Sequence, residues 1–320
     1  LMALFLTDLA SPVPILVLAA AMGLVRPSDI TMRNLLVGET MPADYLMPAM
    51  GVSRTTADSA RVVGALSGAA LVAALGSGLA YVGVSAVYAM SFALTLGVGI
   101  RRLRVLGEGA ERSSPLRILR EGFAYVWATP VVRAVMLLAF LINFAAYPLV
   151  GSLLAYVARN IYGLDQTGLG WLIASFAGGA LLGSIMVSTH GARIRPARTM
   201  IVCSLAWFSF NLAFSWVEQH LLGEAILFAA GFVQSFCMIP MAVILLRVTE
   251  PTFRGRVMGV RMLAVYGLPV GLMLSGPLVE HAGFALTGTA YSLLGIGFTL
   301  LIAVRWRSEL WQVASAANAR

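Results

Sequence analysis

Three ionisable residues, Arg26, Asp29 and Arg33, follow a stretch without charge that runs over residues 9–25. Spacings of three and seven residues place these side chains on one stripe of a helix. If the helix continues from the apolar stretch, Arg26 lies about 18 Å along it, counted from Pro14 at about 1.5 Å per residue. An arginine at that depth in a membrane costs about 2.5 to 3.5 kcal/mol, so it is not expected to face lipid. Two interpretations stay open: Arg26 pairs with Asp29 and closes the helix end, or it offers a charge to a binding cavity.

Uncharged polar residues also interrupt the apolar stretches. Asn143 and Tyr147 lie one turn apart near the middle of the stretch 134–158, and Gln234 lies near the middle of the stretch 225–246. Such side chains often hydrogen-bond a neighbouring helix, for around 0.6 kcal/mol on average. Contact with a bound small molecule is the other interpretation, and both stay open.

Motifs of enzyme and metal chemistry are absent from the sequence. Neither G-x-x-x-x-G-K-[ST], G-x-S-x-G nor H-E-x-x-H occurs, and these are the patterns of nucleotide, serine-hydrolase and zinc-protease sites. Cys203 and Cys237 both fall within apolar stretches, where cysteine behaves as a small buried hydrophobic residue. The sequence therefore predicts no catalytic residue, no metal and no bound cofactor.

Apolar helices must carry these residues. Of the 320 residues, 59% are hydrophobic and only 11% are charged, against roughly 25% charged in a soluble domain. A membrane core needs about 20 apolar residues per helix. The charge-free stretches are 9–25, 62–100, 134–158, 166–192, 199–217, 225–246, 262–279 and 281–304. Because Gly76-Ser77-Gly78 is a turn signal that divides the second stretch, the sequence predicts nine membrane-spanning helices and an apolar stub at residues 1–6.

The basic residues predict the orientation. All 22 are arginine, and the net charge is +8. When the gaps between spans are assigned alternately to the two sides, 21 arginines fall on one side and Arg159 alone on the other. This pattern predicts a multi-pass protein of the cell membrane with a cytoplasmic C-terminus. A nucleic-acid partner is not expected, because the arginines lie in short gaps rather than on a basic surface interleaved with aromatic residues.

An internal repeat organises the spans. Met50-Gly51-Val52 recurs as Met258-Gly259-Val260, and Ser67-Gly68 recurs as Ser275-Gly276, both at an offset of 208 residues. The same offset superposes whole spans. We therefore expect two parallel repeats of six helices, of which the first begins in its third helix and lacks about 77 preceding residues.

The loop before the eleventh helix of the expected twelve-helix arrangement resembles a known family pattern. Glu250-Pro251-Thr252-Phe253-Arg254-Gly255-Arg256-Val257-Met258-Gly259 is similar to a recurrent pattern of the major facilitator superfamily, in its enterobactin-exporter-like and drug-efflux-like branch. The similarity covers essentially the whole chain. Two positions depart from the family: Ala65 stands where the fifth helix often has proline, and the segment 188–195 keeps its basic residues without the usual aspartate.

The resemblance implies an all-α integral membrane fold of two six-helix bundles. The domains expected are 1–100 for the rest of the N-terminal bundle (the end of helix 3 and helices 4 to 6), 101–130 for a cytoplasmic linker, 131–307 for the C-terminal bundle and 308–320 for a cytoplasmic tail. Within the linker, Leu116, Leu119, Phe123 and Val126 recur at helical spacing. This pattern predicts an amphipathic helix on the anionic inner leaflet.

Two sets of site residues follow from the resemblance, because the first, fourth, seventh and tenth helices of the family line a central cavity. The expected substrate cavity comprises Arg26, Asp29, Asn143, Tyr147 and Gln234. The expected gating and bundle contacts comprise Arg33, Asp58, Arg61, Glu250, Arg254 and Arg256. Asp58 and Arg61 also form a pair three residues apart whose side chains can simply reach the membrane interface.

The resulting function is a secondary active transporter. We expect an exporter of a small amphipathic or hydrophobic compound, siderophore-like or drug-like, that works by alternating access. Since no ATP-binding signature occurs, a proton or other ion gradient is the expected energy source, as in an antiporter. We expect a monomer in a bacterial inner membrane. Its expected partners are the lipid bilayer and the small-molecule substrate. A transporter-shaped sensor is the alternative, and an integral-membrane enzyme is the less favoured class.

Overall fold

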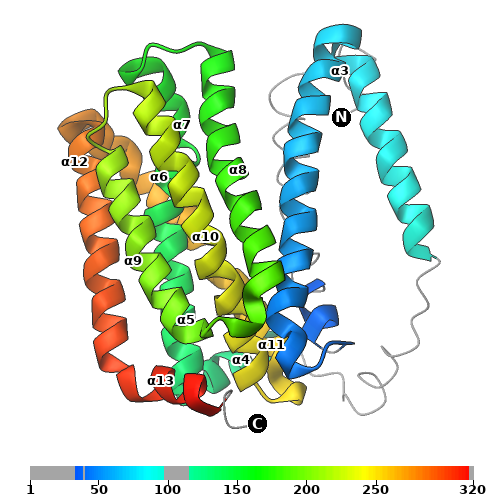
Figure 1. The fold of residues 1–320 in the computed structure, drawn as a ribbon, viewed down its shortest axis with the longest axis vertical. Coiled ribbons are helices and arrows are strands. Elements are labelled where there is room, and N and C mark those ends of the chain that lie inside the picture. The colour runs from blue at the N-terminus through cyan, green and yellow to red at the C-terminus, as the bar shows by residue number, and fades with distance from the viewer. Residues whose placement is uncertain (1–32, 39, 97–114, 317–320) are drawn as a thin grey trace. The chain divides into compact units, whose positions relative to one another are not determined.

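The fold is described by a computed structural model for residues 33–38, 40–96 and 115–316 (Figure 1). Within these ranges the chain forms helices and loops and no strand. Five helical segments there are long and apolar enough to cross a membrane: 130–161, 167–190, 196–214, 220–248 and 251–305. The described part of the chain is therefore all-helical and of membrane type, as the sequence predicts.

The described residues divide into two compact units. One contains residues within Ala60–Ile118, and the other contains Thr31–Ser59 together with Leu119–Arg320. The domain boundary near residue 101 stays a prediction. Residues 33–38 and 40–59 make their contacts with the second half of the chain, so the start of α3 belongs to the same unit as the residues after Leu119.

Helix α3 (Leu46–Leu96) follows the 3₁₀ turn η1 (Ala43–Tyr45) and contains one break, at Gly76. The φ of Gly76 is 75° and its ψ is 168°, a backbone conformation that favours glycine. The predicted turn at Gly76-Ser77-Gly78 is thereby confirmed. The helix begins at Leu46 rather than near residue 62, so Asp58 lies well inside it and is only 2% exposed. Asp58 is therefore packed against other protein atoms, and its place at the membrane interface stays a prediction.

Local sequence signals start the next helices. Proline stands at the first position of α4 (Pro115–Ala128), α5 (Pro130–Leu141) and α9 (Pro196–Phe214), where its missing N–H is of no consequence. Helix α8 (Gln166–His190) starts after Asp165, whose carboxylate accepts the backbone N–H of Gly168 at 2.9 Å. Helix α10 (His220–Val248) follows Gln219 without a side-chain cap.

The predicted seventh span is an irregular helix. After α5 come a π-helical turn, η3 (Ile142–Ala146), then α6 (Tyr147–Val150), α7 (Leu153–Tyr156) and a second π-helical turn, η4 (Val157–Ile161). Pro148 explains part of this irregularity, because proline has no N–H to donate to the preceding turn. In the same segment, Nδ2 of Asn211 on α9 donates to the buried carbonyl of Ala146 at 3.2 Å.

The last span resembles α3 in its backbone. The 3₁₀ turn η6 (Pro251–Phe253) leads into α11 (Arg254–Ala264) and α12 (Gly267–Arg305), and α12 is broken at Gly283, with φ 81° and ψ 167°. Gly283 lies 207 residues after Gly76, close to the repeat offset of 208 in the sequence. The same break therefore occurs at matching places of the two halves, which supports the internal repeat.

The tail predicted for residues 308–320 includes a helix, α13 (Arg307–Ala316). Leu310 is fully buried, and the guanidinium of Arg198 lies over the ring of Trp311 at 5.7 Å. Helix α13 packs against α9 and α5. This segment is thus a part of the folded unit.

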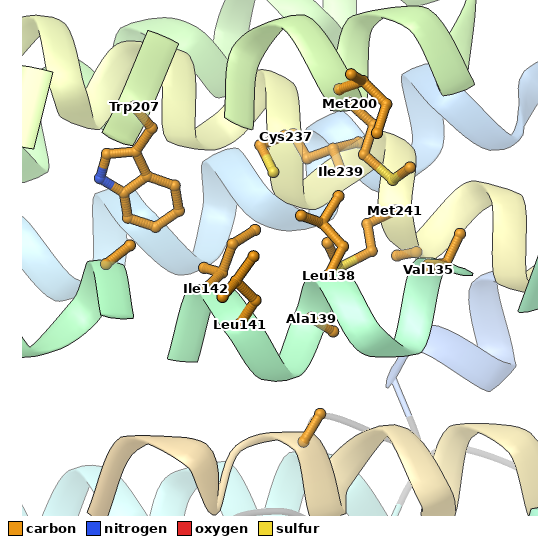
Figure 2. Packing of buried hydrophobic residues seen from close by; sticks show 14 of the residues in the cluster. Val135, Leu138, Ala139, Leu141, Ile142, Met200, Trp207, Cys237, Ile239 and Met241 are labelled. Carbon is orange, nitrogen blue, oxygen red and sulfur yellow. The ribbon is translucent and has the colours of Figure 1, made fainter. Parts of the chain in front are cut away.

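The core lies where α5, α9 and α10 meet. Figure 2 shows Val135 and Leu138 of α5 facing Met200 of α9 and Cys237 and Met241 of α10. Trp207 and Phe208 of α9 and Leu138 of α5 are fully buried. In Figure 1, α8, α9, α10 and the last part of α12 run side by side, and the contacts join α8 to α10, α10 to α9 and α9 to α12.

Candidate functional site

A hydrogen bond joins two of the predicted cavity residues at the centre of the bundle. Nε2 of Gln234 on α10 donates to the hydroxyl of Tyr147 at 2.8 Å. Gln234 is 1% exposed, and Tyr147 is partly exposed at the first position of α6, directly after the π-helical turn. A π-helical turn inside a helix is a frequent feature of functional sites.

Asn143 lies in the same π-helical turn but makes a local contact. Its Nδ2 donates to the carbonyl of Ala139, four residues earlier, at 2.8 Å, and the residue is 8% exposed. The structure therefore places Asn143 one turn from Tyr147 without bonding it to another helix.

An aromatic wall flanks Tyr147. The ring of Trp207 packs edge-on to that of Tyr147 with centroids 5.2 Å apart, and Phe176 of α8 lies 6.4 Å from Trp207. Edge-to-face pairs of this kind contribute about 0.5–1.5 kcal/mol beyond the area they bury. The tyrosine ring is thus held by packing, and its hydroxyl is held by Gln234.

Several buried polar atoms around this pair have no hydrogen-bond partner among the described residues. They are Oε1 of Gln234, Nε1 of Trp207, Oδ1 of Asn211 and Nη1 of Arg261. Such atoms are rare in folded proteins because each costs about 1–3 kcal/mol. Trp207 packs against Tyr147, and Arg261 lies within electrostatic range of it, so a polar solute bound beside Tyr147 would satisfy some of these atoms.

Arg261 is a member of this cluster that the sequence did not predict. The charge-free stretch 262–279 placed Arg261 just outside a span, but α11 begins at Arg254, so the residue lies about two turns inside the helix. It lies within electrostatic range of Tyr147, Arg54 and Cys237. The signal that was available is the position of a lone arginine between Val260 and Met262 in an apolar run.

Arg54 and Asp58 form an ion pair next to the cluster. Nε of Arg54 donates to Oδ2 of Asp58 at 3.0 Å, with side chains 27% and 2% exposed. The neighbouring Thr55 donates its hydroxyl to that of Ser184 on α8 at 3.1 Å. The ion pair lies within α3, and the Thr55–Ser184 bond joins this part of α3 to α8.

The loop before α11 also makes contacts across the unit. Nη1 of Arg254 donates to the carbonyl of Gly38 at 3.2 Å, and Nη1 of Arg256 forms an ion pair with Glu121 of α4 at 3.2 Å. The backbone N–H of Glu250 donates to the hydroxyl of Tyr125 at 3.2 Å. All three predicted gating residues of this loop thus take part in contacts with other segments.

The remaining predicted residues are placed as follows. Arg26 and Asp29 lie outside the described residues. Arg33 is exposed, and Arg61 lies on α3 with a side chain outside the description.

The described residues offer no metal site. No group of three or more His, Cys, Asp or Glu residues comes together within them. An apolar hollow of about 460 Å³ lies elsewhere, beside α12, with Phe144, Pro277 and His281 among its lining residues. The Tyr147 cluster offers hydrogen-bonding groups and the guanidinium of Arg261.

Comparison with characterised proteins finds transporters. The multidrug efflux pump Tap of Mycolicibacterium fortuitum is 26% identical over 302 residues, which cover 91% of this chain and 71% of the pump. Tap of Mycobacterium tuberculosis is 24% identical over 307 residues, with coverages of 93% and 71%. The enterobactin exporter EntS of Escherichia coli is 27% identical over 194 residues, with coverages of 60% and 46%. No protein-family model matches the chain.

The fold is similar to that of a solved transporter structure. The crystal structure of the human organic anion transporter MFSD10 (TETRAN) matches with a TM-score of 0.66, at 16% identity, over 85% of this chain and 67% of that one. Similarity at this level of identity concerns the fold alone.

Proposed function

The chain belongs to the major facilitator superfamily of membrane transporters, and on this premise we propose that it is a secondary active exporter of a small amphipathic or hydrophobic compound. The relatives named above export drugs and a siderophore. Their names supply the compound class and the direction of the proposal.

The Tyr147–Gln234 hydrogen bond is the observation that carries this proposal. It joins the irregular seventh span to α10 in the middle of the bundle, while Oε1 of Gln234 stays buried without a partner among the described residues. A polar group left unsatisfied in an apolar span is costly and typically functional. A transported compound that donates a hydrogen bond would satisfy this oxygen.

Alternating access provides the mechanism. The two bundles would rock about a site near the midplane, so that the site opens to one side of the membrane at a time. The contacts of Arg254 and Arg256 with Gly38 and Glu121 would hold one state closed and break in the other. An ion gradient, with the proton as the first candidate, would drive the cycle, and the C-terminus would be cytoplasmic.

A sensor that keeps the transporter fold is the second candidate. It is favoured by two departures from the family pattern, Ala65 in the fifth helix and the missing aspartate in the segment 188–195. A sensor would bind its ligand at the same cluster without moving it across the membrane.

Transport assays separate the two candidates. The full-length protein would be reconstituted in proteoliposomes with an imposed proton gradient and supplied with amphipathic dyes of both charge signs, ethidium and naphthalene-1-sulfonate. We expect gradient-dependent movement of at least one dye above that in protein-free liposomes. Binding of a dye without any gradient-dependent movement would contradict transport and favour the sensor.

A further inference from the structure

Arg261 is a partly exposed residue whose guanidinium has one buried nitrogen atom. The residue as a whole is partly exposed, whereas its Nη1 is buried and has no hydrogen-bond partner among the described residues. It lies about two turns inside α11, in a segment apolar enough to cross a membrane. One nitrogen of the guanidinium is therefore buried without a partner among the described residues, in a residue that is partly exposed.

The described surroundings of Arg261 hold no carboxylate that acts on its charge. Among the described residues, the groups whose charges act on it are Tyr147, Arg54 and Cys237. Arg54 adds a second positive charge, and the neighbouring Asp58 is bonded to Arg54 at 3.0 Å. Two arginines and one aspartate leave an excess of positive charge, which is expensive in an apolar span unless an anion offsets it.

Tyr147 adds a donor to this excess of positive charge. Its hydroxyl oxygen accepts from Nε2 of Gln234, so its own proton is free to be donated elsewhere. A guanidinium and a hydroxyl donor within electrostatic range of each other form a typical receptor for an oxyanion. The rings of Trp207 and Phe176 beside them would pack against the aromatic or apolar part of the bound compound.

From these contacts we propose that Arg261 and Tyr147 bind the anionic group of the transported compound, a carboxylate, sulfonate or similar oxyanion. The inference rests on the proposed function and names its substrate class as amphipathic anions. Arg261 forms a charge-assisted hydrogen bond with the oxyanion through Nη1, and the hydroxyl of Tyr147 donates a second one. Arg54 strengthens the attraction without contact.

The test compares two probes that differ only in charge, naphthalene-1-sulfonate and naphthalene-1-sulfonamide. The full-length protein is placed in nanodiscs of neutral phosphatidylcholine, and binding is measured by equilibrium dialysis against protein-free nanodiscs. We expect the wild-type protein to bind the sulfonate at least tenfold more tightly than the sulfonamide. Equal affinity for the two probes overturns the proposal, whatever the variants do.

Variants locate the charge that selects the anion. Arg261→Gln is expected to weaken sulfonate binding at least tenfold and to leave sulfonamide binding within twofold, while Arg261→Lys retains most of the preference. Arg195→Gln is the matched control, because Arg195 is exposed in the loop before α9, and it should change neither affinity. An unchanged preference in Arg261→Gln overturns the assignment to this residue.

This binding assay is independent of transport. If no dye moves across proteoliposomes but the sulfonate preference depends on Arg261, the proposed transport fails and the anion site stands. If dyes are transported and the preference is absent, the anion site fails and the proposed transport stands.

Discussion

Helix α10 presents two contrasting interfaces, one to α8 and one to the cluster around Tyr147. At the interface with α8, the backbones of the two helices are in close contact. A Cβ at Gly231 of α10 would collide with the carbonyl of Phe176 of α8, and a Cβ at Gly179 of α8 would collide with the carbonyl of Phe228 of α10. The hydroxyl of Ser235 there donates to the carbonyl of Ala180 at 2.7 Å. Toward Tyr147, by contrast, Gln234 leaves a buried oxygen without a partner among the described residues.

The difference distinguishes an interface that stabilises the bundle from one that serves its proposed function. Small residues let helices approach closely in a membrane, where packing rather than the hydrophobic effect drives association. Unsatisfied buried polar groups lower stability and are kept where function requires them. The α8 interface thus holds the bundle together, and the Tyr147 cluster is the site that we propose.

The largest stability effect is expected at the α8 interface. Gly231→Ala adds a Cβ where the backbone of α8 already lies, so the helices must move apart, and we expect a loss of about 3 kcal/mol. The midpoint of thermal unfolding of the purified full-length protein, followed by circular dichroism, measures it.

Gly297→Ala is the matched control for that measurement. Gly297 is an exposed helical glycine of α12 with no heavy atom close to its missing Cβ. Alanine there should leave stability unchanged or raise it by up to about 1 kcal/mol. Equal effects of the two substitutions would remove the claim that close approach at Gly231 holds α8 and α10 together.

A smaller loss is expected at the border of the site. Asp58→Asn removes the carboxylate from Arg54, and because Asp58 is buried while Arg54 is 27% exposed, we expect a cost of about 2 kcal/mol, between the values of surface and buried ion pairs. Adding Arg54→Gln to Asp58→Asn should recover part of it. Strictly additive effects in this double-mutant cycle would show that the pair does not couple.

Much of the fold could be predicted from the sequence. Charge-free stretches coincide with α8, α9 and α10, and Gly76-Ser77-Gly78 predicted the break in α3. Both features could be predicted because they depend on a short stretch of sequence rather than on distant contacts. The start of α3 at Leu46 was missed because the segment 46–61 contains charges and its burial depends on partners distant in the sequence. The five membrane-length segments are fewer than the nine spans predicted. The segment 251–305 contains two of them, divided at Gly283; the stretch 9–25 lies outside the described residues; and the two spans predicted within 62–100 fall in α3, where Gly78–Leu94 is a shorter apolar helix.

The site could be predicted only in part. Tyr147 and Gln234 stood out as polar residues in apolar stretches, and the structure bonds them to each other. Arg261 was missed because a span was taken to end at the first charge, whereas α11 extends to Arg254. The π-helical turn at Ile142–Ala146 has no sequence signal beyond Pro148, since its register depends on packing against neighbouring helices.

The central claim is that the Tyr147 cluster serves transport rather than stability, and Gln234→Met tests it most directly. Methionine keeps the length of the side chain and removes the unsatisfied oxygen, so stability should stay within about 1 kcal/mol of the wild type. Gradient-driven dye transport by the full-length protein in proteoliposomes should fall at least tenfold. A variant that transports at the wild-type rate would contradict the account, because Gln234 would then be only a bond between two helices.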